Sequence, residues 1–468
     1  MNSKQIIREL KKICGDKNVI SDRNELISYE MDWDKKSSGL CLCTVLPKNV
    51  MEVSKIVKFC HLNLISIIPQ GGNTGLVGGT VPVLKKKEII INLKRINQIN
   101  EIDVINFTAD VGAGLILDNL NQKLSQHNLF FPLEMASSGS SQLGGNIATN
   151  AGGMNVIKYG SIRNNILGIE AVLPNGEIIQ SINKVSKNNT GYNLTNLLCG
   201  SEGTLGIITR STLKIYPILD LSKTLLVAFT GLNNLLNFYR HFQKYFNTKI
   251  ERCELLTKIN FKLSMKHSLI KDSFFKKDYN FYLLIKLGYS EKKYDIYNDL
   301  DHFFTEFNNL FSDVLLSQSI KQEDDFWKFR EIITEAQKIE GRVIHNDISV
   351  PISNLKMFFH DCERDLNERI RDFIVYPFGH LGDGNIHYNI IISGNRKNFE
   401  TIENKVYETV NKNVKKHDGS ISAEHGIGLF KKNELIKFHD KNTLKLIKNI
   451  KKNIDPKNIM NRSKVIDL

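Results

Sequence analysis

The pattern of apolar and polar residues divides the chain into two parts. From residue 40 to about 217, short β-branched runs alternate with glycine-rich turns and a few helical segments. Beyond Pro217 glycines become sparse and apolar residues recur at helical spacing. This spacing predicts helices over four ranges: 291–311, 321–340, 396–416 and 433–452.

Strand-like runs lie between these helices in the second part. They are YNFYLLIKLGY at 279–289, RVIHNDISV at 342–350 and NIHYNIII at 385–392. Strands mixed with helices in this way predict an α+β domain, with an antiparallel sheet and helices packed on one face.

The length of the chain also indicates more than one core. A single core rarely organises more than about 250–300 residues, and this chain has 468. We therefore expect a first domain over 1–217 and a second over 218–430 that includes a metal site. The C-terminal segment, 431–468, is expected to pack back on the first domain.

Composition narrows the classes of partner. The formal net charge is +13, but the lysines are scattered, and neither aromatic stacking residues nor a helix-turn-helix signal accompanies them, so nucleic acid is not expected as a partner. An anionic substrate would still be attracted. No run of 18 apolar residues predicts a membrane span. The seven cysteines form no C-x-x-C pair, and a reducing, cytoplasmic location is expected.

Three glycine-rich segments are the candidate cofactor site. They are PQGGNTGLVGG at 69–79, SGSSQLGGNIATNAGG at 138–153 and GSEGTLGII at 200–208. Glycines let backbone N–H groups turn inward and form an anion-binding nest, although a plain hairpin loop explains the first segment equally well. Gly112 and Gly114 lack the third glycine of a dinucleotide-binding fingerprint, because Leu117 takes its place, and the sequence has no Walker loop.

Polar residues in the second part suggest a metal centre and an anion receptor. His380, His387 and Glu424 supply two imidazoles and a carboxylate, a set that suits zinc. Polar residues satisfied within a turn are the alternative explanation. Arg330 and Thr334 stand four apart on a predicted helix, so both side chains can face one point. A guanidinium there can bind a carboxylate, or it can simply form a surface ion pair.

Five motifs together resemble one enzyme family. They are PQGGNTGLVGGT, GGNIATNAGGMNVIKYGSIRNNILGIEAVLPNGE, NTGYNLTNLLCGSEGTLGIIT, GHLGDGNIHYN and GSISAEHGIG. They are similar to the FAD-linked D-2-hydroxyacid dehydrogenases, which are flavoproteins of the vanillyl-alcohol-oxidase type. The members most similar are the D-2-hydroxyglutarate and D-lactate dehydrogenases and the flavoprotein subunit of glycolate oxidase. The motifs occur in order over nearly the whole chain.

The resemblance implies that the first domain binds FAD, with the pyrophosphate on 69–79 and the isoalloxazine against 138–153. No histidine or tyrosine lies in the 69–79 loop, so non-covalent FAD is expected. The implied cofactor contacts are Pro69, Gly71, Gly72, Asn73, Thr74, Gly75, Leu76, Ser138, Gly139, Ser140, Gly144, Asn146, Thr149, Asn150, Gly153, Glu202, Gly206, Ile207, Ile208 and Asn385.

The resemblance also implies roles in the reaction, in which a D-2-hydroxy acid gives its hydride to flavin N5 and becomes the 2-keto acid. His380, His387 and Glu424 would bind the metal, and His425 would bind substrate and remove the hydroxyl proton, unless it only supports the ligands. Arg330, Thr334, His345 and Asn389 would bind substrate. The D-2-hydroxyglutarate enzymes have lysine where this chain has His345, so D-lactate and glycolate stay open as alternative substrates.

Other functions remain as competing hypotheses. The same scaffold can serve a flavin-using synthase or an oxidase of aromatic alcohols, although the metal set with Arg330 disfavours both. A subunit that only relays electrons is another possibility. The expected electron acceptor is a quinone, an electron-transfer flavoprotein or a cytochrome, and a homodimer is the assembly considered.

Overall fold

The computed structural model describes residues 1–85, 87–268, 274–393 and 398–468. The chain forms two compact units. The first consists of Met1–Gly152, Gly160–Ile218 and Glu424–Leu468, and the second of Gly153–Tyr159 and Leu219–Ala423. Compared with the expected ranges 1–217, 218–430 and 431–468, residues 153–159 belong to the second unit and the chain re-enters the first at Glu424.

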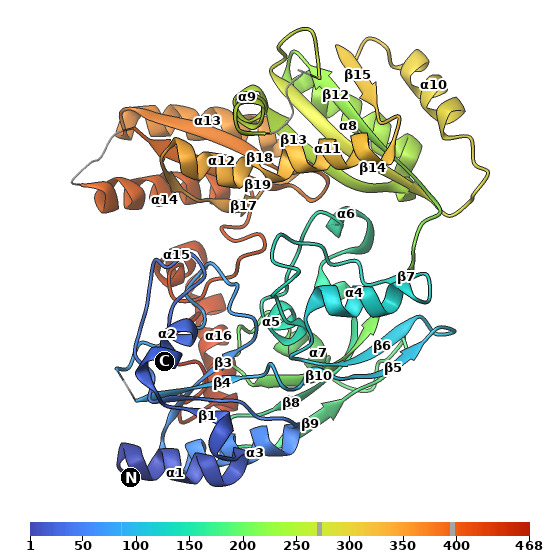
Figure 1. The fold of residues 1–468 in the computed structure, drawn as a ribbon. Helices are drawn as coiled ribbons and strands as arrows, with labels where there is room; N and C mark the ends of the chain where they lie inside the picture. Colours follow the sequence, from blue (N-terminus) through green and yellow to red (C-terminus); the bar gives the residue numbers. More distant parts are fainter. Residues whose placement is uncertain (86, 269–273, 394–397) are drawn as a thin grey trace. The chain divides into compact units, whose positions relative to one another are not determined.

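The first unit contains two main sheets (Figure 1). In the four-stranded sheet, ordered β1-β2-β4-β3, β4 is parallel to both β2 and β3. The five-stranded sheet is antiparallel, in the order β5-β6-β10-β8-β9. The strands are β1 Val19–Ile20, β2 Cys43–Val45, β3 Ser66–Gln70, β4 Glu88–Asn92, β5 Ile99–Asp103, β6 Thr108–Gly112, β7 Leu129–Phe130, β8 Ile166–Val172, β9 Ile178–Ser181, β10 Ile207–Lys214 and β11 Tyr216–Pro217.

Helices cover the four-stranded sheet because their apolar faces match it. Val53, Ile56 and Val57 of α3 lie in one core with Ile89 and Ile91 of β4. All five residues of β4 are buried, as is usual for a strand inside a parallel arrangement. The helices of this unit are α1 Ser3–Cys14, α2 Arg23–Glu30, α3 Val50–Asn63, α4 Leu117–Ser125, α5 Leu143–Ala148, α7 Leu194–Leu198, α15 Lys432–Phe438 and α16 Lys441–Ile454.

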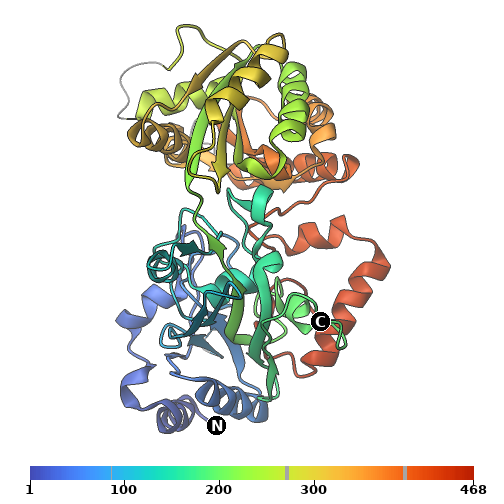
Figure 2. The ribbon, with the colours of Figure 1, turned by 90° about the vertical axis from the view of Figure 1, so that its right-hand side faces the viewer.

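The predicted helix over 433–452 is wrong in one respect, because the structure divides it into α15 and α16 (Figure 2). The helix is interrupted at Asp440. Its carboxylate accepts hydrogen bonds from the backbone N–H groups of Asn442 and Thr443 and so caps the start of α16. Lys451 of α16 is buried, and its ammonium pairs with Asp455 at 2.6 Å and donates to the Thr204 carbonyl at 2.8 Å. These bonds hold the C-terminal segment in the first unit.

The second unit is built on one antiparallel sheet in the order β15-β12-β14-β13-β18-β19-β16, with β17 also paired to β19, which confirms the expected antiparallel α+β architecture. Its strands are β12 Leu221–Phe229, β13 Ile250–Thr257, β14 Phe281–Tyr289, β15 Asp313–Leu316, β16 Arg342–Ile344, β17 Asp347–Ser349, β18 Phe373–His380 and β19 Asn385–Ile392. Its helices are α6 Val156–Tyr159, α8 Leu232–Phe246, α9 Lys258–His267, α10 Ile296–Glu306, α11 Ile320–Glu331, α12 Ile333–Glu340, α13 Leu355–Arg369 and α14 Phe399–Lys416.

Helices pack on both faces of this sheet, so the expectation of one covered face is wrong. On one face of β12, Leu226 and Ala228 lie in a core with residues of α9 and α11. On the other face Phe229 meets Phe238 of α8, with ring centroids 5.2 Å apart. A strand that is covered on both sides has an unbroken run of apolar residues in its sequence, such as LLVAF in β12.

Several predicted elements differ in extent from the observed ones. The range 321–340 divides into α11 and α12 at Ile332, whose backbone nevertheless stays helical. The run 342–350 divides into β16 and β17, and 291–311 shortens to α10. Residues 396 and 397 of the predicted helix over 396–416 lie outside the described residues. Throughout the described ranges, each helix is too short or too polar to cross a bilayer.

Candidate functional site

The first unit contains a hollow of about 880 Å³, part of it open to solvent. Loop 69–80, helix α5, the turn at 202–203 and the start of β10 form most of its wall. It is lined by Pro69, Gln70, Gly71, Gly72, Asn73, Thr74, Gly75, Val77, Gly79, Thr80, Leu93, Gln142, Gly144, Gly145, Asn146, Ala148, Thr149, Glu202, Gly203, Gly206, Ile207, Ile208, His425 and Asn461.

Most of the expected cofactor residues line this hollow, but seven do not. These seven are Leu76, Ser138, Gly139, Ser140, Asn150, Gly153 and Asn385. Ser140 lies just outside, and a side chain at Gly72 would meet its carbonyl oxygen at 2.1 Å, so only glycine allows this close approach. Asn150 instead supports the fold, because its Oδ1 accepts from the Ser161 hydroxyl at 3.1 Å. Gly153 and Asn385 belong to the second unit.

Two lining residues that the sequence did not single out have unsatisfied polar atoms. Gln142 Oε1 and Asn461 Oδ1 are buried and have no hydrogen-bond partner in the described part of the chain. Buried polar atoms normally find a partner, so these two fit a ligand with hydroxyl or N–H donors. Gln142 lies inside the second glycine-rich segment, whereas nothing in the local sequence around Asn461 indicates a pocket.

Glu202 fixes the loop that bears His425. Its carboxylate accepts hydrogen bonds from the backbone N–H groups of Ile427 and Gly428, each at 2.7 Å. Burial raises the pKa of Glu202, although these two hydrogen bonds act in the opposite direction. Gly426 has φ +83°, and a Cβ there would meet Glu202 Oε1 at 2.9 Å. Glu202 therefore holds the turn that follows His425, another lining residue of the hollow.

The β18–β19 hairpin positions the two candidate metal-binding histidines. In its register Phe378 is opposite His387, and His380 is opposite Asn385. His380 is thus two residues from the partner of His387, and both side chains leave the same face of the sheet. Their ring centroids are 5.4 Å apart. The turn between them is tight and uses Gly384 at φ +75°.

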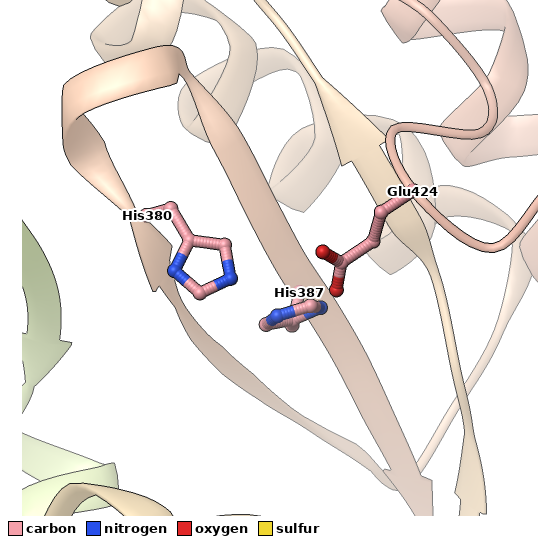
Figure 3. A group of neighbouring side chains, drawn as sticks. All are labelled: His380, His387 and Glu424. Atoms are coloured by element: carbon pink, nitrogen blue, oxygen red, sulfur yellow. The ribbon is translucent and has the colours of Figure 1, made fainter. Parts of the chain in front are cut away.

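His380, His387 and Glu424 each offer a ligand atom, and these atoms lie within 4.8 Å of one another. Figure 3 shows the three side chains converging. Asp347, Glu424 and His425 satisfy the same criterion. Asp347 Oδ1 also lies 3.9 Å from His387 Nδ1, and the sequence had not indicated this carboxylate. Two imidazoles and one carboxylate form a donor set that zinc accepts.

Arg330 is buried rather than part of a surface ion pair. It is 7% exposed, its guanidinium lies over the Phe378 ring at 4.6 Å, and its Nε donates to Glu254 Oε2 at 2.7 Å. Glu254 is completely buried, and its Oε1 lies 2.5 Å from His380 Nδ1. Sequence reasoning missed Glu254, because the strand IERCELLT around it shows no motif.

The remaining expected substrate residues lie in the second unit. Thr334 is on α12 and half-buried, and His345 lies between β16 and β17. Asn389 is on the same face of β19 as His387 and is buried, but its side-chain amide already donates to Gln337 Oε1 at 2.8 Å and accepts from the Asn346 N–H. To contact the substrate directly, the Asn389 amide would have to share these hydrogen bonds between the protein and the substrate.

Comparisons with known proteins identify the family of the chain. Residues 41–181 match the FAD binding domain, and residues 220–465 match the C-terminal domain of FAD linked oxidases. A D-2-hydroxyglutarate dehydrogenase from Arabidopsis thaliana is 37% identical, covering 97% of this chain and 80% of that protein. One from Danio rerio is 34% identical, covering 96% and 83%. The chain belongs to the FAD-linked D-2-hydroxyacid dehydrogenase family.

Membership of the FAD-linked D-2-hydroxyacid dehydrogenases makes the chain an oxidoreductase whose cofactor is FAD. A solved structure of p-cresol methylhydroxylase resembles it with a TM-score of 0.72 at 16% identity, covering 99% of this chain and 97% of that one. This likeness confirms the expected vanillyl-alcohol-oxidase-type fold.

The expected cytoplasmic location is wrong. Both relatives are named mitochondrial proteins, which points to the mitochondrion. The prediction had depended on the cysteines. All seven are buried thiols without a disulfide, and such thiols indicate a reducing environment without distinguishing one compartment from another.

Proposed function

We propose that this dehydrogenase oxidises D-2-hydroxyglutarate to the 2-keto acid with the help of a divalent metal, most simply zinc. The observation that supports this best is the group of His380, His387 and Glu424, together with a buried arginine that shares the carboxylate of Glu254 with His380. Relatives named for D-2-hydroxyglutarate favour that substrate.

We place FAD, bound non-covalently, in the hollow of the first unit. Glycines of the 69–79 loop leave room for a pyrophosphate, since a Cβ at Gly75 would meet nothing within 4 Å. Gln142 and Asn461 join the predicted contacts, because their side-chain oxygens, which have no partner among the described residues, suit the hydroxyl and imide donors of the cofactor. When bound, FAD supplies the acceptor for the substrate hydride at N5.

The metal proposal rests on the donor set and its support. Zinc sites in enzymes commonly have three protein ligands and one open position, and a metal-bound histidine usually donates its other ring N–H to a carboxylate. Glu254 provides that carboxylate for His380 at 2.5 Å. When bound, a divalent cation supplies a Lewis acid that lowers the pKa of a coordinated hydroxyl.

Different side chains bind the substrate and remove its hydroxyl proton. The Arg330 guanidinium binds a substrate carboxylate through its terminal nitrogens, because Nε is occupied by Glu254. Thr334 and Asn389 offer further polar contacts. His425 accepts the hydroxyl proton while the hydride leaves from carbon, since an imidazole is a suitable base near neutral pH.

D-lactate is the second candidate substrate, and glycolate is the third. Each has a single carboxylate. The family resemblance implies a lysine in the D-2-hydroxyglutarate enzymes at the position where this chain has His345. A neutral imidazole would bind a distal carboxylate less strongly than an ammonium, so His345 favours a substrate with a single carboxylate.

Anaerobic bleaching of the bound flavin tests the proposal. The purified protein would be treated with a chelator and mixed with D-2-hydroxyglutarate, D-lactate, D-malate or glycolate, each with and without added zinc. We expect D-2-hydroxyglutarate to bleach the flavin fastest, and only with zinc. Faster bleaching by D-lactate would select the alternative. Bound FAD that none of the acids reduces would refute the proposed reaction.

The proposal extends to location and electron transfer. We infer a mitochondrial location from the names of the two relatives. There, a quinone, an electron-transfer flavoprotein or a cytochrome would reoxidise the flavin. Subcellular fractionation and reoxidation kinetics with each acceptor class test these two points, and light scattering tests the homodimer.

A further inference from the structure

Glu254 contacts two residues to which the proposed function gives different tasks. One carboxylate oxygen, Oε1, lies 2.5 Å from His380 Nδ1, and the other, Oε2, accepts from Arg330 Nε at 2.7 Å. The side chain is fully buried, so water does not compete for either oxygen. A single carboxylate thus joins the candidate metal ligand to the candidate carboxylate receptor.

The backbone fixes this contact from two directions. Glu254 on β13 is directly opposite His380 on β18 in the sheet register, so the imidazole and the carboxylate are cross-strand neighbours on one face. Arg330 reaches Glu254 from α11, and its guanidinium packs over the Phe378 ring at 4.6 Å. All three residues belong to the second unit.

The contact determines which atoms of each partner can bind a ligand. If His380 donates its Nδ1 proton to Glu254, the lone pair of Nε2 is available for a cation. For Arg330, Nε makes the hydrogen bond that is seen among the described residues. Its two terminal nitrogens are then the donors available for a carboxylate, and such a fork binds both oxygens at once.

Glu254, His380 and Arg330 form a buried set of polar side chains joined by two short contacts of the Glu254 carboxylate. Removing one member of such a buried set leaves an unpaired charge, which is costly. A purely structural ion triad would share this property, so stability alone does not reveal a further role.

We propose that Glu254 is a positioning residue that couples metal binding to recognition of the substrate carboxylate. It sets the tautomer of His380 and orients the guanidinium of Arg330. One side chain therefore positions both the metal ligand and the group that binds the substrate carboxylate. The inference rests on the proposed function for the identity of the substrate and the metal. The contact itself does not depend on that function.

The test replaces Glu254 by glutamine in the full-length, FAD-loaded protein. Zinc affinity would be measured after chelation by competition with a zinc-binding dye, and the KM for D-2-hydroxyglutarate at saturating zinc. We expect zinc affinity to fall by about 10- to 100-fold, as when such outer carboxylates are lost elsewhere. The KM is expected to rise, with the FAD content unchanged.

A second comparison separates positioning from mere structural support. If Glu254 acts through Arg330, the KM increase caused by Glu254→Gln should disappear in an Arg330→Ala background, while the loss of zinc affinity remains. Glu323→Gln is the matched control: Glu323 is a half-buried carboxylate of the same unit that pairs with Lys286 at 3.0 Å. It should leave zinc affinity and KM at wild-type values.

Wild-type zinc affinity in Glu254→Gln, or a KM effect that persists without Arg330, would overturn the proposal. If the glutamine variant does not fold, Glu254→Asp keeps the charge but is one methylene shorter and cannot reach both partners. It should weaken zinc binding or raise KM, and wild-type values of both would overturn the proposal too. A wild-type protein that binds zinc but oxidises no hydroxy acid would refute the proposed function instead.

Discussion

Arg330 differs from a surface arginine because its surroundings restrict it. The side chain is 8% exposed, packs on Phe378 and uses Nε to reach Glu254. An immobilised guanidinium loses little entropy when it binds a carboxylate, and its planar fork matches both oxygens. Positive charge alone would not provide this geometry.

Arg330→Lys is expected to raise the KM for the hydroxy acid by about tenfold or more, because a lysine cannot make two parallel hydrogen bonds and still contact Glu254. Steady-state kinetics at saturating zinc measure this. Arg364→Lys, at a half-exposed arginine paired with Asp361 and Asp365, serves as the control with unchanged KM. Equal KM values in both variants would contradict a role of Arg330 toward the carboxylate.

Lys464 gives the first unit a pH-dependent contribution to stability. The side chain is 1% exposed and its ammonium donates to the Val81 carbonyl at 2.7 Å. Burial lowers its pKa to about 8, compared with about 10.4 in an unfolded chain. Between these values the unfolded state binds more protons, so stability should rise with pH.

Lys464→Met should abolish this rise. The free energy of unfolding of the wild type minus that of the variant is expected to increase between pH 8 and about 10.4, on the order of 3 kcal/mol in total. Urea denaturation across this pH range measures the difference. A constant difference would show that Lys464 has an ordinary pKa in the folded protein.

At the scale of elements, the β18–β19 hairpin depends on one glycine. Gly384 has φ +75°, and a Cβ at this position would lie 2.3 Å from the Val350 carbonyl oxygen. That oxygen belongs to the backbone and cannot move away cheaply. The residue therefore fixes the turn that sets the distance between His380 and His387.

Gly384→Ala is expected to lower both stability and zinc affinity, because strain and the clash displace the hairpin. Gly191→Ala is the control: Gly191 has φ +103°, but a Cβ at this position would meet nothing within 4 Å. It should cost about 1–3 kcal/mol at most and leave zinc affinity intact. Thermal denaturation and dye competition measure the two properties, and equal zinc affinities would refute the role of the turn.

At the scale of the whole molecule, the hollow proposed for FAD and the two candidate metal-binding histidines lie in different units. Every residue that lines the hollow proposed for FAD belongs to the first unit. Of the three candidate metal ligands, His380 and His387 belong to the second unit and Glu424 to the first. Loss of the metal therefore need not remove FAD, and loss of FAD need not remove the metal. This division suits independent measurement of flavin and metal.

His380→Ala should abolish zinc binding and turnover while the protein keeps its yellow flavin. Conversely, Gln142→Ala should weaken FAD retention and leave zinc affinity unchanged, because Gln142 lines the hollow of the first unit. Flavin absorbance and metal analysis of the purified variants give both readings. Loss of FAD from His380→Ala would show that the two sites are not separable.

The sequence by itself indicated the features that depend on local spacing. Glycine-rich loops, the strand 385–392 and the seven-residue interval between His380 and His387 are local, since a hairpin places such residues on one face. Helix interruptions were missed when they depended on a single polar cap, as at Asp440. Coverage of both sheet faces was missed because an unbroken apolar run does not say what packs on it.

Only the tertiary structure decided the contacts between residues far apart in the chain. Glu254 reaches His380 and Arg330 across 126 and 76 positions, and Asn461 returns to the hollow from near the C-terminus. No periodicity links such residues, because strand order and helix packing bring them together. The sequence therefore specified the groups that can perform the chemistry, and the fold determined which of them support one another.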